Sequence, residues 1–157
     1  MSARRLALAV VAVAALAMLG ACGEIDTTAL APIDDYQTWR QFPPQVGAVD
    51  GHGSSYREIF VNDVASEYAH AGRYRDGAVL VKRIHALGPG NSKGPLSYVA
   101  IMRKLDEPPD DLPTDGGWLF TKVAGEVGVA EERHFSLCWN TCHRQAPWDG
   151  VYFDYGE

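Results

Sequence analysis

Residues 72–85, GRYRDGAVLVKRIH, decide the fold of this chain. Arg75, Asp76 and Gly77 have the composition of a tight turn, because aspartate and glycine adopt turn conformations at little cost. The turn leads into residues 78–85, which are rich in valine, leucine and isoleucine. Such a segment directly after a turn predicts a β-strand.

The sequence on both sides of this stretch repeats the pattern. Residues 56–62, 96–104 and 118–123 are rich in β-branched and aromatic side chains, and they predict three more strands. Short strands joined by turn-rich loops are typical of an antiparallel sheet. The predicted fold class is therefore α+β, mainly β: a twisted antiparallel sheet with a few short helices in a single domain.

The segments between the strands predict the remaining structure. Helices are expected at residues 36–42, where Pro43 and Pro44 would end the first helix, and at 63–71. The Gly-rich and Pro-rich compositions of the connecting segments predict loops at residues 46–55, 88–95 and 106–115.

The N-terminus has the pattern of an export signal. Arg4 and Arg5 precede an apolar run over residues 6–19. Leu19, Gly20 and Ala21 stand directly before Cys22. The run is shorter than the roughly 20 residues that span a bilayer, and its end resembles the lipobox of bacterial lipoproteins. The alternative is an ordinary signal peptide with a chance cysteine.

This pattern predicts the domain organisation and the location of the chain. Residues 1–21 would be removed, Cys22 would carry lipid, residues 22–34 would form a tether, and residues 35–157 would form the domain. Gly23, where enteric sorting rules would place aspartate for inner-membrane retention, favours the outer membrane facing the periplasm.

Composition excludes one class of function. The net charge is −6, and no cluster of basic residues is present. An acidic chain of this kind argues against nucleic-acid binding, which requires a basic surface. The chain also contains four Trp and seven Tyr, so most of it is expected to fold.

The two remaining cysteines lie in the motif CWNTCH, residues 138–143. Two thiols followed directly by a histidine are typical of covalent c-type haem attachment, in which the thiols of Cys138 and Cys142 form thioethers and His143 binds the iron. Three residues separate these cysteines where the usual motif has two. A Cys138–Cys142 disulfide, or a zinc site completed by His134, remains open.

The chain resembles the cytochrome P-460 and cytochrome c′-beta family of exported mono-haem proteins. The similar segments are residues 56–62, 67–70, 72–82 and 116–120, followed by the cysteine motif, Ala146 and residues 149–153. They occur in the order typical of the family.

The resemblance implies one haem c beside the sheet, with iron bound by His143 on one side and an open position on the other. Members bind nitric oxide and other small ligands, and some oxidise hydroxylamine. By the same resemblance, Arg57 would lie in the distal pocket, and Lys82 would be the lysine that cross-links to the porphyrin edge in some members. Glu131 and Glu132 are the candidates for a distal catalytic carboxylate.

We therefore expect a lipid-anchored mono-haem cytochrome that binds or converts a small nitrogen species, with a redox partner that the sequence does not identify. The alternatives are a simple electron-transfer cytochrome and a haem-free lipoprotein with a Cys138–Cys142 disulfide that acts as a binding module. The other histidines, His52, His70, His85 and His134, fit no ligand spacing and are expected at the surface or in loops.

Overall fold

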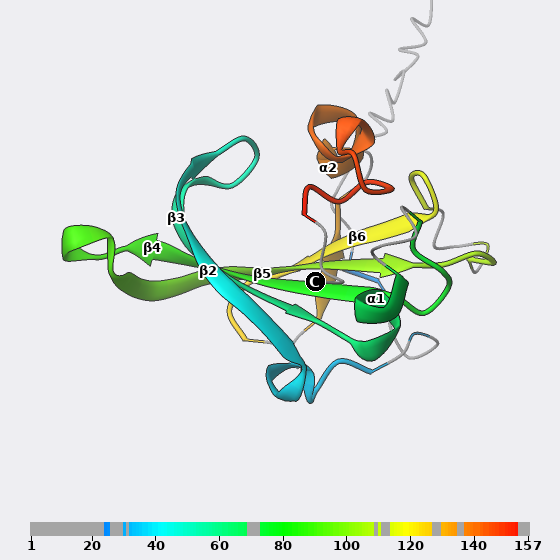
Figure 1. Cartoon of the computed structure of the whole chain (residues 1–157), viewed down its shortest axis with the longest axis horizontal. Helices are drawn as coiled ribbons and strands as arrows, with labels where there is room; N and C mark the ends of the chain where they lie inside the picture. The colour runs from blue at the N-terminus through cyan, green and yellow to red at the C-terminus, as the bar shows by residue number, and fades with distance from the viewer. Residues whose placement is uncertain are drawn as a thin grey trace, which may run out of the picture.

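One antiparallel sheet forms the frame of the protein in the computed structural model, which describes residues 24–25, 30, 32–68, 73–108, 110, 114–126, 130–134 and 137–153. Its seven strands are arranged in the order β1-β7-β6-β5-β4-β3-β2 (Figure 1). The strands are β1 (Glu24–Ile25), β2 (Arg40–Val49), β3 (Gly53–Val61), β4 (Val79–Leu87), β5 (Lys93–Lys104), β6 (Trp118–Val123) and β7 (Glu131–Arg133). The predicted mainly β architecture is confirmed.

Helices are few and short. The two α-helices are α1 (Asp63–Tyr68) and α2 (Leu137–Thr141), and the 3-10 helices are η1 (Tyr36–Thr38), η3 (Pro89–Asn91) and η4 (His143–Gln145). Helix α1 begins after Asn62, whose side-chain oxygen accepts the backbone N–H of Ala65 at 3.0 Å, as an N-cap residue does.

The sheet packs on both faces, because successive side chains of a strand point to opposite sides. On the side called here the front face, Ile59, Leu80 and Phe120 pack with residues of α1 and α2. On the back face, Phe60 and Val81 pack against Ile33 and Tyr36 from the segment before β2. Figure 1 shows α2 and the β2–β3 hairpin on the same side of the sheet.

The predictions for residues 36–42 and 46–55 were wrong. Only residues 36–38 are helical, and β2 runs through Pro43 and Pro44 and pairs with β3 across both predicted segments. Proline is tolerated there because β2 is an edge strand and its register shifts between Phe42 and Gln45. A strand edge and a bulge are the positions where a missing N–H costs least.

The N-terminal segment also differs from a free tether where it is described. Residues 24–25 pair with β7, and Leu30 and Ile33 are buried. The predicted leader and Cys22 lie outside the described residues. No helix in the described parts of the chain is long and apolar enough to cross a membrane.

Candidate haem-binding site

A cavity of about 710 Å³ lies between the front face, the β2–β3 hairpin and α2. Its volume is within the roughly 300–1,000 Å³ of pockets that enclose small organic ligands. The residues that line it include five of the predicted site residues: Arg57, Lys82, Cys138, Cys142 and His143. Arg57 and the cysteine motif, which are 80 or more positions apart in sequence, thus line the same cavity.

One helical turn accommodates the unusual cysteine spacing. The backbone N–H of Cys142 donates to the oxygen of Cys138 at 3.2 Å, so the two cysteines have the i and i+4 relation of an α-helix. Side chains with this relation share one face, with about 5–6 Å between their Cβ atoms. Both thiols are free, and both line the cavity. The extra residue therefore does not turn either sulfur away.

His143 follows this turn, and a hydrogen bond to the backbone of Gly150 holds its ring. Its Nδ1 lies 2.7 Å from the oxygen of Gly150, and its ring packs 5.1 Å from that of Phe120. Burial lowers the pKa of His143 more than the Gly150 hydrogen bond raises it. A neutral imidazole with Nδ1 bonded to a carbonyl leaves Nε2 available, which is the usual arrangement of a metal-binding histidine.

Trp139, inside the motif, anchors α2 to the sheet. Its ring lies so close to Gly116 that a Cβ atom there would approach ring carbons to 2.3 Å. Trp139 also lies against Gly150, whose neighbour Asp149 accepts a hydrogen bond from Trp118 through its backbone oxygen at 2.7 Å. Glycine at position 116, in the turn before β6, is therefore required by the close approach of α2.

Lys82 lies on the front face in the middle of the sheet. It pairs with Ile59 on β3 and with Ala100 on β5. The small side chain of Ala100 leaves space beside Lys82 on the front face. Burial, with a smaller contribution from the charge of Arg57, lowers the pKa of Lys82 to about 8. A substantial fraction of this amine is therefore neutral near physiological pH. A neutral amine suits the cross-link to the porphyrin that the family resemblance implies.

Arg57 is 3% exposed and is fixed by the β2–β3 hairpin. Its Nη1 donates to the oxygen of Gly47 at 2.8 Å and to the Oγ of Ser55 at 2.9 Å. These bonds hold the guanidinium at the wall of the cavity.

The model of the family Cytochrome P460 matches residues 33–153, which include strands β2 to β7 and the whole cavity wall. The chain belongs to the cytochrome P460 family. No curated protein matches it.

Cytochromes of this family carry haem, and the residues of the cavity fit that group. Two thiols share one face of a helical turn, a histidine with a free Nε2 follows them, and the chamber is large enough for an organic cofactor. The described residues contain no cluster of three or more His, Cys, Asp or Glu side chains that could hold a metal ion.

The two predicted carboxylates do not line the cavity of this cytochrome P460. Glu131 is buried and forms a two-bond ion pair with Arg103, at 2.6 and 2.7 Å. Glu132 is exposed on β7. The carboxylate that does line the cavity is Asp50, in the turn between β2 and β3.

Several cavity residues were missed by sequence reasoning. They are His52, Tyr98, Met102 and Lys122. His134, considered above only as a zinc ligand, also lines the cavity. Strand alternation could have identified Tyr98 and Met102, because they share the parity of Ala100, the partner of Lys82. No local signal marks His52, which comes from the hairpin turn.

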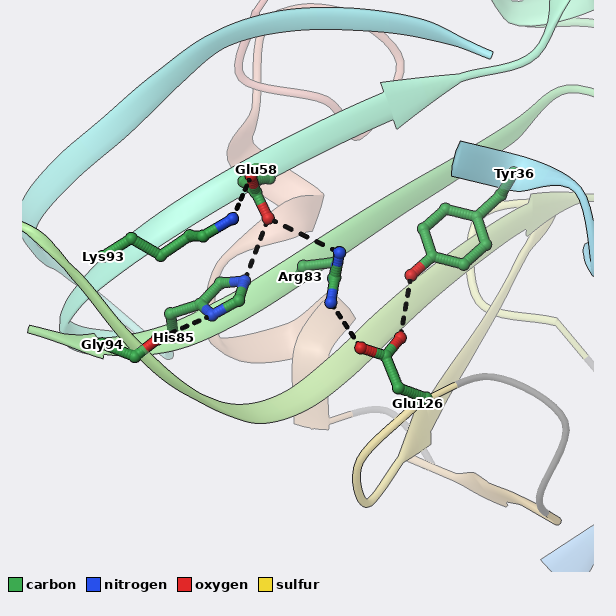
Figure 2. Close-up of polar contacts among 7 residues, drawn as sticks. All are labelled: Tyr36, Glu58, Arg83, His85, Lys93, Gly94 and Glu126. Carbon is green, nitrogen blue, oxygen red and sulfur yellow. Dashed lines mark hydrogen bonds and ion pairs between the residues drawn. The ribbon is translucent and has the colours of Figure 1, made fainter. Parts of the chain in front are cut away.

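His85, expected at the surface or in a loop, is buried behind the cavity wall (Figure 2). Its Nε2 lies 3.0 Å from the carboxylate of Glu58, which also accepts from Lys93 at 2.9 Å. Figure 2 shows that this cluster continues through Arg83 and Glu126 to Tyr36. Arg57 and Glu58 are adjacent on β3, so the cavity arginine and this back-face cluster are positioned by the same strand.

Proposed function

We propose that this chain is a lipid-anchored c-type mono-haem cytochrome that binds or redox-converts a small nitrogen species, such as nitric oxide or hydroxylamine, at a five-coordinate iron. The observation that carries the proposal is the convergence of Cys138, Cys142 and the free Nε2 of His143 on one cavity. Membership of the cytochrome P460 family supports haem as the group that this cavity binds.

The chain's own residues would hold the cofactor in defined ways. Cys138 and Cys142 would attach it through thioethers, and His143 Nε2 would bind the iron. A haem held by a single histidine supplies a redox-active metal with one position open to a small ligand. Arg57 would donate a charge-assisted hydrogen bond to that ligand, and Lys82 would be the residue that cross-links to the porphyrin.

A simple electron-transfer cytochrome is the second candidate, because the cavity also contains side chains able to bind iron. Met102, His52 and His134 line it. A second axial side chain would close the position that a ligand needs. The absorbance spectrum separates the two: the five-coordinate form gives a high-spin spectrum that changes on adding nitric oxide, whereas a six-coordinate form stays low-spin.

The haem itself is tested by exporting the protein from a host that matures c-type cytochromes. We expect a coloured product whose intact mass includes one haem that survives extraction with acidified acetone. A colourless product with the mass of the bare chain would overturn the proposal in favour of the haem-free lipoprotein. Cys138→Ala together with Cys142→Ala is the matched control, because it removes both attachment points.

We also propose that the mature chain begins at a lipid-modified Cys22 and faces the periplasm from the outer membrane. Its support is the lipobox-like sequence before that residue. Fractionation tests this: the wild type should remain with outer-membrane vesicles and show the mass of the lipid, and Cys22→Ala should not. Recovery of both proteins in the soluble fraction would contradict the anchor.

A further inference from the structure

The cavity wall carries more positive than negative charge. Arg57, Lys82 and Lys122 line it, and Asp50 is the single carboxylate among the described lining residues. None of the three basic side chains takes part in an ion pair within the described part of the chain. A cleft lined mainly by one sign of charge, with apolar walls between, concentrates ions of the opposite sign.

Arg57 has hydrogen-bonding capacity that the protein does not use. Three acceptors satisfy Nη1, namely the oxygens of Gly47 and Ser55 and the Oγ of Ser55, but the buried Nε has no hydrogen-bond partner among the described residues. A buried donor without a partner costs free energy, so Arg57 keeps donor capacity that the described part of the protein does not satisfy.

His52 and Tyr98 supply a second donor. His52 Nδ1 lies 2.9 Å from the hydroxyl oxygen of Tyr98. If Tyr98 donates to Nδ1, then His52 Nε2 keeps its hydrogen; if Nδ1 donates, then the Tyr98 hydroxyl keeps its own. Either tautomer leaves one polar hydrogen of the pair unused.

Electrostatics keeps this pair neutral and places cations beside it. Burial, together with the nearby charges of Lys82 and Arg57, lowers the pKa of His52 to about 3. The Nζ of Lys122 lies 4.8 Å from the centre of the Tyr98 ring. The donors of the His52–Tyr98 pair thus lie in a positive field that favours an acceptor with negative charge.

We propose that Arg57 and the His52–Tyr98 pair form a subsite for a small anion with the chemistry of nitrite or of a carboxylate group. The anion has two sources: free nitrite, or a carboxylate of the haem itself. The haem carboxylate can be the source only if the proposed function holds, because that function supplies the haem. Free nitrite does not depend on it. The subsite goes beyond that function, because nitric oxide and hydroxylamine are neutral ligands.

The test is calorimetric titration of the haem-loaded protein with nitrite, together with crystal structures grown with and without nitrite. Tyr98→Phe removes one hydroxyl and keeps the ring under Lys122, and Arg57→Gln removes the charge. Loss of a charge-assisted hydrogen bond weakens binding about tenfold or more, so we expect at least a tenfold higher Kd for Arg57→Gln, with partial recovery in Arg57→Lys. Arg73→Gln, an exposed residue outside the cavity wall, makes the same charge change and should match the wild type.

The outcomes separate the two sources. Nitrite within hydrogen-bond distance of Arg57 and the His52–Tyr98 pair, weakened by both variants, supports free nitrite as the occupant. A haem carboxylate at the same atoms, with nitrite affinity unchanged by the variants, supports the haem as the source. Neither anion at these atoms, with equal nitrite affinity in all proteins, would overturn the subsite. Because Tyr98→Phe keeps the ring and its packing, the test stands even if Arg57→Gln does not fold.

Failure of the proposed function is a different result. A colourless protein shows that haem is not bound, and nitrite can still be titrated into it by the same calorimetry. Tenfold weakening in Arg57→Gln would then support the subsite without haem, and equal affinity would overturn both proposals.

Discussion

The Nδ1 atom of His143 lies 2.7 Å from the backbone oxygen of Gly150, seven residues later in the chain. This bond closes the C-terminal segment into a loop whose shape fixes the imidazole. Gly150 has a φ of 86°, a value that side chains disfavour. The orientation of the proposed iron ligand therefore depends on a residue that contributes no side chain.

Gly150→Ala is the first prediction that follows. A Cβ there would meet the Trp139 ring at 2.9 Å and Trp118 Nε1 at 3.2 Å, in addition to the backbone strain. We expect the free energy of unfolding, measured by urea denaturation, to fall by about 1–3 kcal/mol more than backbone strain alone would cause. We also expect the haem spectrum to change, because His143 would move. Gly77→Ala is the matched control, because its φ is 82° and nothing lies within 4 Å of its Cβ position. Equal losses in the two variants would contradict the packing argument.

Lys82→Ala tests the proposed cross-link to the porphyrin. If the amine is bonded to the ring, the wild type should show a shifted Soret band, which the variant should restore to that of an ordinary c-type haem. The mass of a haem-bearing peptide that joins Lys82 to residues 138–142 should be lost as well. Lys122→Ala, another lysine at the cavity wall, is the control. An unchanged Soret band in Lys82→Ala argues against the cross-link.

The lowered pKa of Lys82 predicts how stability depends on pH in the polypeptide made without haem. Folding moves this pKa from 10.5 to about 8, a difference worth about 3 kcal/mol. Below pH 8 the amine is charged in both states and the full penalty applies. Between about 8 and 10.5 the unfolded chain binds more protons, so stability rises with pH.

Lys82→Met should therefore stabilise this polypeptide by about 2–3 kcal/mol at pH 7. That advantage should shrink as the pH rises through 8 and vanish near 10.5. Chemical denaturation across this pH range measures it. A constant difference between variant and wild type would show that Lys82 does not titrate in this window.

The strands were predictable from sequence because their signal is local. The predicted segments 78–85, 96–104 and 118–123 coincide closely with β4, β5 and β6, where β-branched and aromatic residues are dense. Strand β2 was not predictable, because Pro43 and Pro44 are compatible with a strand only at an edge, and edge position is set by the order of the whole sheet.

The site was predictable to the extent that it lies in a motif. Cys138, Cys142 and His143 were candidates because they form a cysteine–histidine motif, although its spacing has one residue more than usual, and Arg57 and Lys82 were candidates by family resemblance. All five line the cavity. His52 reaches the cavity because the hairpin curls over the sheet. His85 is buried with its two ring nitrogens within hydrogen-bond distance of the Glu58 carboxylate and the oxygen of Gly94. Those contacts depend on tertiary structure, which no local pattern records.

Glu58→Gln tests the back-face cluster of Figure 2. Burial raises the pKa of Glu58, but the hydrogen bonds and charges of Lys93 and His85 outweigh it and leave the pKa below its ordinary value. Stability from this group is present above the ordinary pKa and is lost as the pH falls through the lowered one.

We expect Glu58→Gln to lose about 1–3 kcal/mol of unfolding free energy at pH 7, because it removes the carboxylate that binds His85, Arg83 and Lys93. The loss should diminish as the pH falls below the ordinary carboxyl range and Glu58 takes up a proton. Glu126→Gln is the control: this carboxylate is 54% exposed and should contribute at most about 1 kcal/mol. Similar losses in both variants would contradict the central role of Glu58.

The last prediction concerns the carboxylate that hydroxylamine oxidation would require. Glu131 is committed to Arg103 and also accepts the hydroxyl of Thr121 at 2.6 Å, so it has no free oxygen for a substrate. Glu131→Gln should lower the free energy of unfolding by about 3–5 kcal/mol, whereas exposed Glu132→Gln should change it by less than about 0.5 kcal/mol. Neither variant, where folded, should reduce turnover per haem. If a carboxylate assists the reaction, Asp50→Asn should reduce it, because Asp50 lines the cavity. Selective loss of turnover in Glu132→Gln, with stability and haem content retained, would show instead that β7 moves its carboxylate to the substrate.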